Sequence, residues 1–477
     1  MSKDTISDER ATDIARSAAW GTWFNTKDRR KDLATIRDYY EGTAGIPKVA
    51  EGTVKEVRRL AEHSIENICK VVVDAFVRGM SVVGFRDGQA EENPAAWSIW
   101  QRQRLDARQV EAHRPALIYG SSYALVLPDV DDEATVVLYS PRFCHVKYAT
   151  RRALFPQQAM FWAQAKVDQP ATFILVDDTK VYEGQLEAAP QGLEGAIDGL
   201  SQAKITNEWE HGATYKGEPV CPVVKFTNDL DADGNHTVGE VEPLLKVQQA
   251  MNSVNFNRLT AARFAAFNQV VTVGWDTDGE QLITASSATW VNLPVDKNDF
   301  DLRNIPATPL APFNELLEEM KEYVALLAAI PLYQATGNLS NVSTETAAMV
   351  EAAYQRKLDL KRESFGESWE LVLRLAAEMD GVDVPSEATE VVWRETTSRS
   401  FGAVVDGITK IANLQPAQAE MLIELLDMVP GMTQQRLGAI RGVLKRAQAA
   451  TVIEQVLAAP SLTPVEIVTE VDTTQVA

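Results

Sequence analysis

The stretch that decides the fold is VEPLLKVQQAMNSVNFNRLTAARFAAF, residues 241–267. Pro243 lies where a helix accepts proline most readily, in the first turn. Leu244, Val247 and Met251 follow at helical spacing on one face. Because an α-helix rises about 1.5 Å per residue, the stretch predicts a helix of roughly 40 Å.

A second helix is predicted to return along the first. Between the two, residues 268–311 contain the apolar runs QVVTVGW and ATWVNLP, which predict a small strand-rich tip. The helical period resumes over residues 312–330 and stops at Ile330-Pro331. We therefore expect a rod of two antiparallel helices, on which the rest of the chain is built.

An uncharged loop and one very long helix follow the rod. The loop YQATGNLSNVS precedes an uninterrupted helical pattern from Thr344 to Met379, roughly 54 Å long at the same rise. An apolar stripe through Phe365 and Trp369 predicts the buried side of this helix. Its basic cluster alternates with acidic residues, so we expect a salt-bridged surface at Arg356, Lys357, Lys361 and Arg362.

The remaining segments predict an α+β protein that is predominantly helical. Helices are expected before Gly120 and again after residue 400. Short β-branched and aromatic runs from Ser122 to Thr227 predict a twisted meander, and VVWRETTSRSF predicts one strand that returns to it.

Composition narrows the function classes. The formal net charge of −21 argues against a general nucleic-acid clamp, which would carry a basic face. Three cysteines indicate no disulfide framework, and neither an apolar leader nor a membrane-length apolar run is present, so we expect a protein made in the cytoplasm and without a membrane partner.

A search for catalytic and ligand-binding motifs finds none. The common phosphate-binding loops, the zinc-protease motif and C-x-x-C pairs are missing. The adjacent Cys144 and His145 would point to opposite faces of a strand, and DLDADGNHT lacks the distal glutamate of a calcium loop. We expect no catalytic residues, no metal and no cofactor, and buried or surface roles for His63 and His113.

The first rod helix carries a polar side with few charges. Amides and small residues suit a surface packed against identical neighbours, although packing within one chain is an equally good interpretation. The candidate subunit-packing residues are Gln248, Asn252, Asn255 and Arg263.

Several stretches, in this order, are similar to the portal (head–tail connector) proteins of tailed bacteriophages, in particular those of long-tailed actinobacterial phages. They are DYYEGTAGIP, VVVDAFVRGMSVVGF, LDARQVEAHRPALIYGSSYALV, GEPVCPVVKFTND, the rod helix, and AAIPLYQATGNLSNVSTETAAMVEAAYQRKLDLKRESFGESWELVLRLA. Together they cover most of residues 35–400.

The resemblance implies a portal fold that assembles as a ring, usually a dodecamer, at one capsid vertex in the virion. It assigns residues 1–60 to an N-terminal arm, 61–240 to a wing, 241–267 and 312–330 to the stem, 268–311 to the clip, 331–343 to the tunnel loop, 344–400 to the wing helix and its strand, 401–457 to a crown and 458–477 to a flexible tail.

The resemblance also implies partners and sites. Double-stranded DNA would pass through the channel without sequence specificity, while the capsid protein, terminase large subunit, head–tail adaptor and a scaffold protein would contact the ring. The DNA-facing residues would be Tyr333, Gln334, Thr336, Gly337, Asn338, Ser340 and Asn341. The clip residues that contact adaptor or terminase would be Trp275, Asp278, Trp290 and Asn292.

Two other functions stay open from the sequence. A structural scaffold that never forms a channel would have residues 268–311 paired with its own wing. A metal-dependent nuclease would need a carboxylate cluster, for which the sequence gives no positive sign.

Overall fold

The structure is a computed structural model of the chain. It divides the chain into two units, Met1–Arg394 and Glu395–Ala477, and all but one of the residues described below belong to the first. The described residues are 32–49, 55–86, 94–129, 133–150, 152–162, 172–186, 203–234, 236–266, 269–273, 290–293, 301–305, 308–337, 344–394 and 442.

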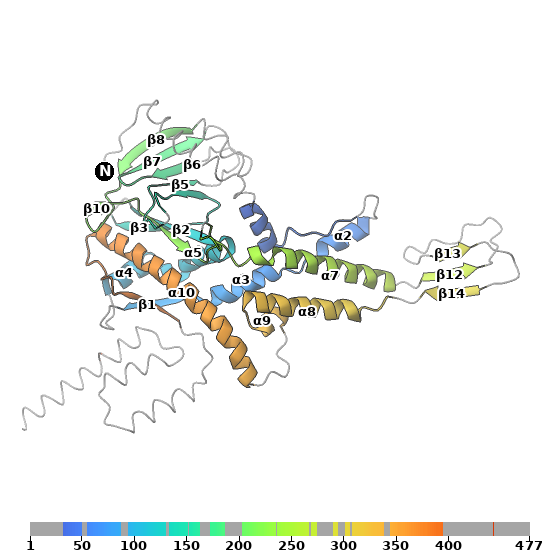
Figure 1. Cartoon of the computed structure of the whole chain (residues 1–477). Coiled ribbons are helices and arrows are strands. Elements are labelled where there is room, and N and C mark those ends of the chain that lie inside the picture. Colours follow the sequence, from blue (N-terminus) through green and yellow to red (C-terminus); the bar gives the residue numbers. More distant parts are fainter. Residues whose placement is uncertain are drawn as a thin grey trace, which may run out of the picture. The chain divides into compact units, whose positions relative to one another are not determined.

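Two antiparallel helices form the predicted rod (Figure 1). A short 3-10 turn, η2 (Glu242–Leu244), leads into α7 (Leu245–Ala265), and α8 (Ala311–Ala328) returns beside it. The Arg258 guanidinium donates to the Asn314 side-chain oxygen at 3.1 Å, which aligns the start of α8 with the distal half of α7.

A three-stranded sheet lies between the rod helices in sequence and at their far end in space (Figure 1). Strand β12 (Gln269–Val273) pairs in parallel with β13 (Trp290–Leu293) and antiparallel with β14 (Asp301–Ile305). None of these strands pairs with a described strand of the remaining chain, so the sheet is self-contained.

Several helices precede the rod in the chain. Residues 32–41 are helical, and α2 (Lys55–His63), α3 (Ile68–Gly79), α4 (Pro94–Arg102) and α5 (Leu105–Tyr119) follow. The Asn67 side chain caps α3 by accepting from the Lys70 amide at 3.2 Å. Gly120 ends α5 at φ +91°, where a Cβ would lie 2.5 Å from the carbonyl carbon of Thr237, so glycine is required there.

The predicted meander is present for part of residues 122–227, and the remaining strands form a separate sheet. Strands β4 (Cys144–Lys147), β5 (Gln158–Trp162), β6 (Thr172–Val176), β7 (Lys180–Leu186) and β8 (Ala203–Glu210) form one antiparallel sheet in chain order. A second sheet has the order β11-β2-β3, with β2 (Ser121–Pro128), β3 (Ala134–Tyr139) and β11 (Val223–Thr227), and β9 (Thr214–Tyr215) pairs with β10 (Glu218–Pro219).

The long helix α10 (Thr344–Asp380) packs across β2, β3, β11 and α4. Phe365 and Trp369 are fully buried in the main core, as the apolar stripe predicts, and Trp369 meets Phe226 and Trp100 edge to face. Strand β15 (Glu390–Trp393) returns along α10 and pairs antiparallel with β1 (Val82–Arg86). The prediction that this strand returns to the meander is therefore wrong, because β1 and β15 form a two-stranded sheet of their own.

Candidate functional site

The amide side chains of α7 face inward, towards the α2–α3 connection. Gln248 accepts from the Ile68 amide at 2.9 Å and donates to Asn252 at 2.7 Å. Asn252 donates to the Gly45 carbonyl at 3.1 Å, and Asn255 donates to the Ser64 carbonyl at 2.8 Å. Each amide therefore satisfies backbone groups that would otherwise be buried without a partner.

These contacts correct the subunit-packing prediction for three of its four residues. Gln248, Asn252 and Asn255 expose 1, 0 and 4% of their surface within a single chain. Packing within the chain, the alternative left open by the sequence, is what the structure has. Arg263 is exposed near the far end of α7 and stays a candidate for contact with a neighbour.

The segment expected to line the channel begins as a helix. Residues 331–343 were expected to be a loop, but Leu332–Thr336 form the short helix α9, which is held at its start by the Gln334 amide donating to the Pro331 carbonyl at 2.9 Å. Gly337 ends it at φ +72°. The proline that stops α8 thus starts a new turn. The predicted residues Asn338, Ser340 and Asn341 lie outside the described residues.

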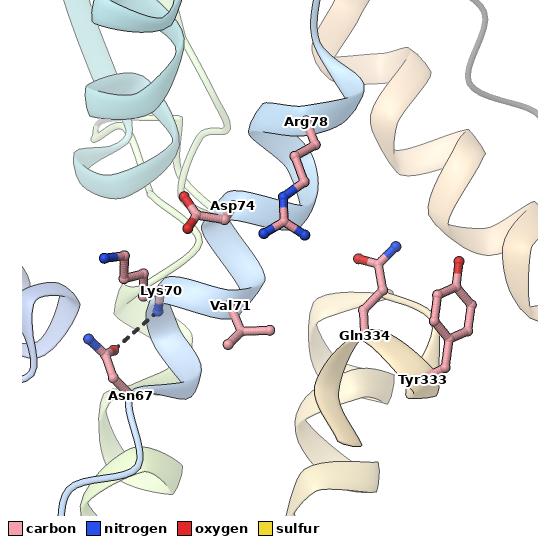
Figure 2. Close-up of a pocket in the computed structure, with 7 residues that line it drawn as sticks. All are labelled: Asn67, Lys70, Val71, Asp74, Arg78, Tyr333 and Gln334. Atoms are coloured by element: carbon pink, nitrogen blue, oxygen red, sulfur yellow. Dashed lines mark hydrogen bonds between the residues drawn. The ribbon is translucent and has the colours of Figure 1, made fainter. Parts of the chain in front are cut away.

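Helix α9 packs beside α3, and the two line an open pocket of about 500 Å³. Figure 2 shows Gln334 and Arg78 on facing sides of it, with Val71 between the two helices. Tyr333 is about 39% exposed at its edge. The lining residues are Asn67, Lys70, Val71, Asp74, Arg78, Tyr333 and Gln334.

A buried ionic cluster ties this region to α10. The Lys361 ammonium donates to Glu240 and to Asn228, both at 2.6 Å, while the Lys357 ammonium donates to Glu240 at 2.7 Å. Lys357 also donates to the Ala328 carbonyl at 3.1 Å, at the last residue of α8. One carboxylate thus holds two ammonium groups, one of which caps the rod's return helix.

The electrostatics of this cluster follow from its burial. Burial alone would raise the pKa of the Glu240 carboxyl, but the Lys361 and Lys357 ammonium groups outweigh it and lower the pKa to about 2. Burial lowers the pKa of the Lys361 ammonium, against the pull of Glu240. The Phe76 ring lies 5.1 and 5.3 Å from the two ammonium nitrogens and adds a cation–π contact to each.

The prediction of a salt-bridged surface on α10 is therefore wrong for two residues. Lys361 and Arg362 are buried, at 3 and 8% exposure. The Arg362 guanidinium donates to the Gly79 carbonyl at 2.7 Å and to the Arg394 carbonyl at 2.8 Å, which fixes α10 to the end of α3 and the end of β15. Sequence reasoning missed this cluster because Glu240 is more than a hundred positions away from its partners.

In the part of the chain that the structure describes, no group of three or more His, Cys, Asp or Glu side chains is placed to hold a metal ion. No helix in that part has the length and apolarity to cross a membrane. His113 is buried and accepts from the Trp369 indole at 2.8 Å, in line with the structural role expected for it.

Of the four predicted clip residues, Trp290 and Asn292 lie in β13, the strand at one edge of the tip sheet. Trp275 and Asp278 lie outside the described residues. The tip sheet therefore presents two of the four predicted contact positions on one strand.

A rod of two helices with a separate sheet at its tip, an uncharged segment at its base and a wing of helices and strands is the architecture expected of a head–tail connector (Figure 1). The chain belongs to the phage portal protein family of the SPP1 Gp6-like type, whose model matches residues 23–447. This confirms the resemblance and assigns the chain the function of a phage portal protein, which supports a location in the virion.

Two curated relatives carry the same description. The portal protein of Mycobacterium phage L5 is 24% identical over 408 residues, which cover 81% of this chain and 79% of the relative. The portal protein of Mycobacterium phage D29 is 23% identical over 406 residues, which cover 81 and 80%. A solved chain from the virion of a native gene transfer agent particle aligns with a TM-score of 0.42 and 11% identity, over 88% of this chain and 99% of that chain.

Proposed function

We propose that this portal protein forms a closed ring, a dodecamer, at one capsid vertex, and that double-stranded DNA passes through its centre during packaging and ejection. The observation that carries the proposal is that the segment from Pro331 to Gly337, which follows α8 at the base of the rod, has no charged side chain. The protein acts as a conduit and docking ring, and ATP hydrolysis belongs to a separate chain.

The charge pattern suits a conduit. A channel that neutralises many phosphates binds DNA tightly and resists its movement. The hydroxyl of Tyr333 and the amide of Gln334 can contact phosphate and sugar weakly and without sequence preference. The Thr336 hydroxyl donates to the Leu332 carbonyl at 3.1 Å within α9. The adjoining face of α3 carries Lys70 and Arg78 on either side of Asp74, so its local net charge stays small.

The tip sheet is the proposed clip, where terminase docks first and the adaptor later. It is built from one short chain segment and pairs with no other described strand, so it can present its edge strand β13 to a partner. Edge strands offer unpaired backbone groups for such contacts. Trp290 and Asn292 are the proposed contact residues of this strand. The division of the chain into arm, wing, stem, clip, tunnel loop, crown and tail is also part of the proposal.

The direct test is negative-stain electron microscopy of purified protein with mass measured by light scattering on the same sample. Rings with a central channel and a mass of about twelve subunits would support the proposal. A small closed dimer that buries α7 and α8 would overturn it in favour of the non-channel scaffold.

Deletion of residues 334–341 tests the conduit separately. We expect rings to assemble with unchanged mass but DNA packaging or retention to fall, because the role proposed for the segment is contact with DNA. Loss of the rings themselves would contradict the assignment of this segment. Deletion of residues 231–234, in the turn after Leu230, removes no buried residue and provides the control.

A further inference from the structure

The outer side of α8 is left uncovered by the described part of the chain. Four large apolar side chains on it are 41, 53, 79 and 42% exposed: Leu316, Tyr323, Leu326 and Leu327. Four exposed carboxylates, none in an ion pair with a described residue, lie among them: Glu315, Glu318, Glu319 and Glu322. An apolar and acidic surface of this kind is typical of a protein interface rather than of a solvated helix.

The opposite side of the rod is basic. Helix α2 packs on α7, which in turn packs on α8, so the three helices lie in the order α2, α7, α8 (Figure 1). The exposed bases of α2 form no ion pair with a described residue, and Val57 and Leu60 are half-buried among them. The bases are Lys55, Arg58 and Arg59, and they outnumber the one exposed carboxylate described on this helix, Glu62.

The two surfaces lie at the same level along the rod. The Asn255 side-chain amide donates a hydrogen bond to the carbonyl of Ser64, the residue after α2. The end of α2 is therefore level with the middle of α7, and α2 extends from there towards the tip (Figure 1). The start of α8 is level with Arg258 through its bond to Asn314. The bases of α2 and the carboxylates of the first turns of α8 are therefore at matching heights.

We infer that the acidic, apolar side of α8 in one copy of this chain docks against the basic side formed by α2 and α7 in the next copy, head to tail. The inference rests on the proposed ring with its axis running along the rod, because rotation about such an axis keeps every residue at its own height and so brings the matched levels together. A head-to-tail contact of two different surfaces is also the kind that closes into a ring. Burial of the leucines and Tyr323 supplies affinity, and the charges set the polarity of the contact.

The test uses two charge-reversal variants of the full chain with different tags. The first is Glu315→Lys with Glu318→Lys, and the second is Arg58→Glu with Arg59→Glu. Each places like charges across the proposed contact, so we expect each variant alone to yield at least tenfold fewer rings, with the mass falling towards the 52.6 kDa of one chain. Circular dichroism checks that the variants are folded.

Co-expression of the two variants is the decisive arm. In an alternating ring, the reversed α8 of one variant faces the reversed α2 of the other, and the two native surfaces also face each other. We therefore expect even-numbered rings that contain both tags. The matched control, Glu210→Lys with Glu218→Lys, changes the charge equally at exposed positions away from the rod and should assemble as the wild type does.

Three results would overturn the inference: normal rings from either variant alone, folded variants that do not complement each other, or rings lost equally in the control. The first would mean that another segment of the chain or a different partner covers α8. Wild-type protein that forms no ring under any condition would instead count against the proposed function, so the two failures are distinguishable.

Discussion

The ionic cluster at the base of the rod makes the sharpest prediction about stability. Replacement Glu240→Gln keeps the shape of the side chain but leaves Lys361, whose side chain is 4% exposed, without a counter-charge. Removing one partner of a buried ion pair costs about 3–5 kcal/mol, because the remaining charge is buried and uncompensated. The lowered pKa gives a consistent value: a change from 4.5 to about 2 corresponds to about 3 kcal/mol.

The measurement is urea unfolding of the wild type and of Glu240→Gln at pH 7, followed by tryptophan fluorescence and circular dichroism. The control is Glu242→Gln, which removes an exposed carboxylate two residues away and should change the free energy of unfolding by less than about 0.5 kcal/mol. If the two variants unfold within that margin of each other, the cluster does not stabilise the fold as argued.

The pH dependence provides a second check on the same residue. Because the pKa of Glu240 is lower in the folded chain than its ordinary value of 4.5, its contribution is complete above that pH and is lost as the pH falls towards about 2. The wild type should lose this stability over that window, and Glu240→Gln should not. Parallel pH profiles for the two proteins would contradict the assignment.

Two further predictions concern the core. Burial lowers the pKa of His113 to about 3, so between pH 6.5 and about 3 only the unfolded chain takes up a proton at this residue. The free energy of unfolding should therefore fall with decreasing pH, by about 2 kcal/mol at pH 5. His113→Gln, which keeps an acceptor for Trp369, should remove this part of the pH dependence in urea melts. Gly120→Ala should destabilise the chain by more than Gly212→Ala does. Both positions have positive φ, but only at Gly120 would the new Cβ meet backbone, at 2.5 Å from the Thr237 carbonyl carbon. Equal melting temperatures for the two variants would contradict the steric argument.

Periodicity alone was sufficient to predict the rod, the meander and the long helix. The rod helices are long and strongly patterned, and the strands between Ser122 and Thr227 are separated by clear turn residues, so local sequence determines each element. Helix α9 was missed because it has only five residues, too few for a period to show. Its start depends on Pro331, a residue that in the sequence alone marks the end of the preceding helix.

The polar groups of the site were harder to predict, and for a different reason. Gln248 and Asn252 look like a surface on a helical wheel, but their partners are backbone groups at residues 45–68, nearly two hundred positions away. Lys361 likewise looks solvated until Glu240 is placed beside it. Burial of a polar side chain is decided by a partner from a distant segment, and one sequence carries no pattern for that pairing.

The cluster also gives a physical reason why the rod is firmly rooted. Glu240 lies just before η2, the turn that leads into α7, and the Ala328 carbonyl lies at the end of α8. Lys357 is therefore hydrogen-bonded to groups at the start of the first rod helix and at the end of the second. Lys357 and Lys361 are one turn apart on α10, which Arg362 anchors to α3 and β15. A load applied to the tip would therefore be transmitted through α10 to α3 and β15.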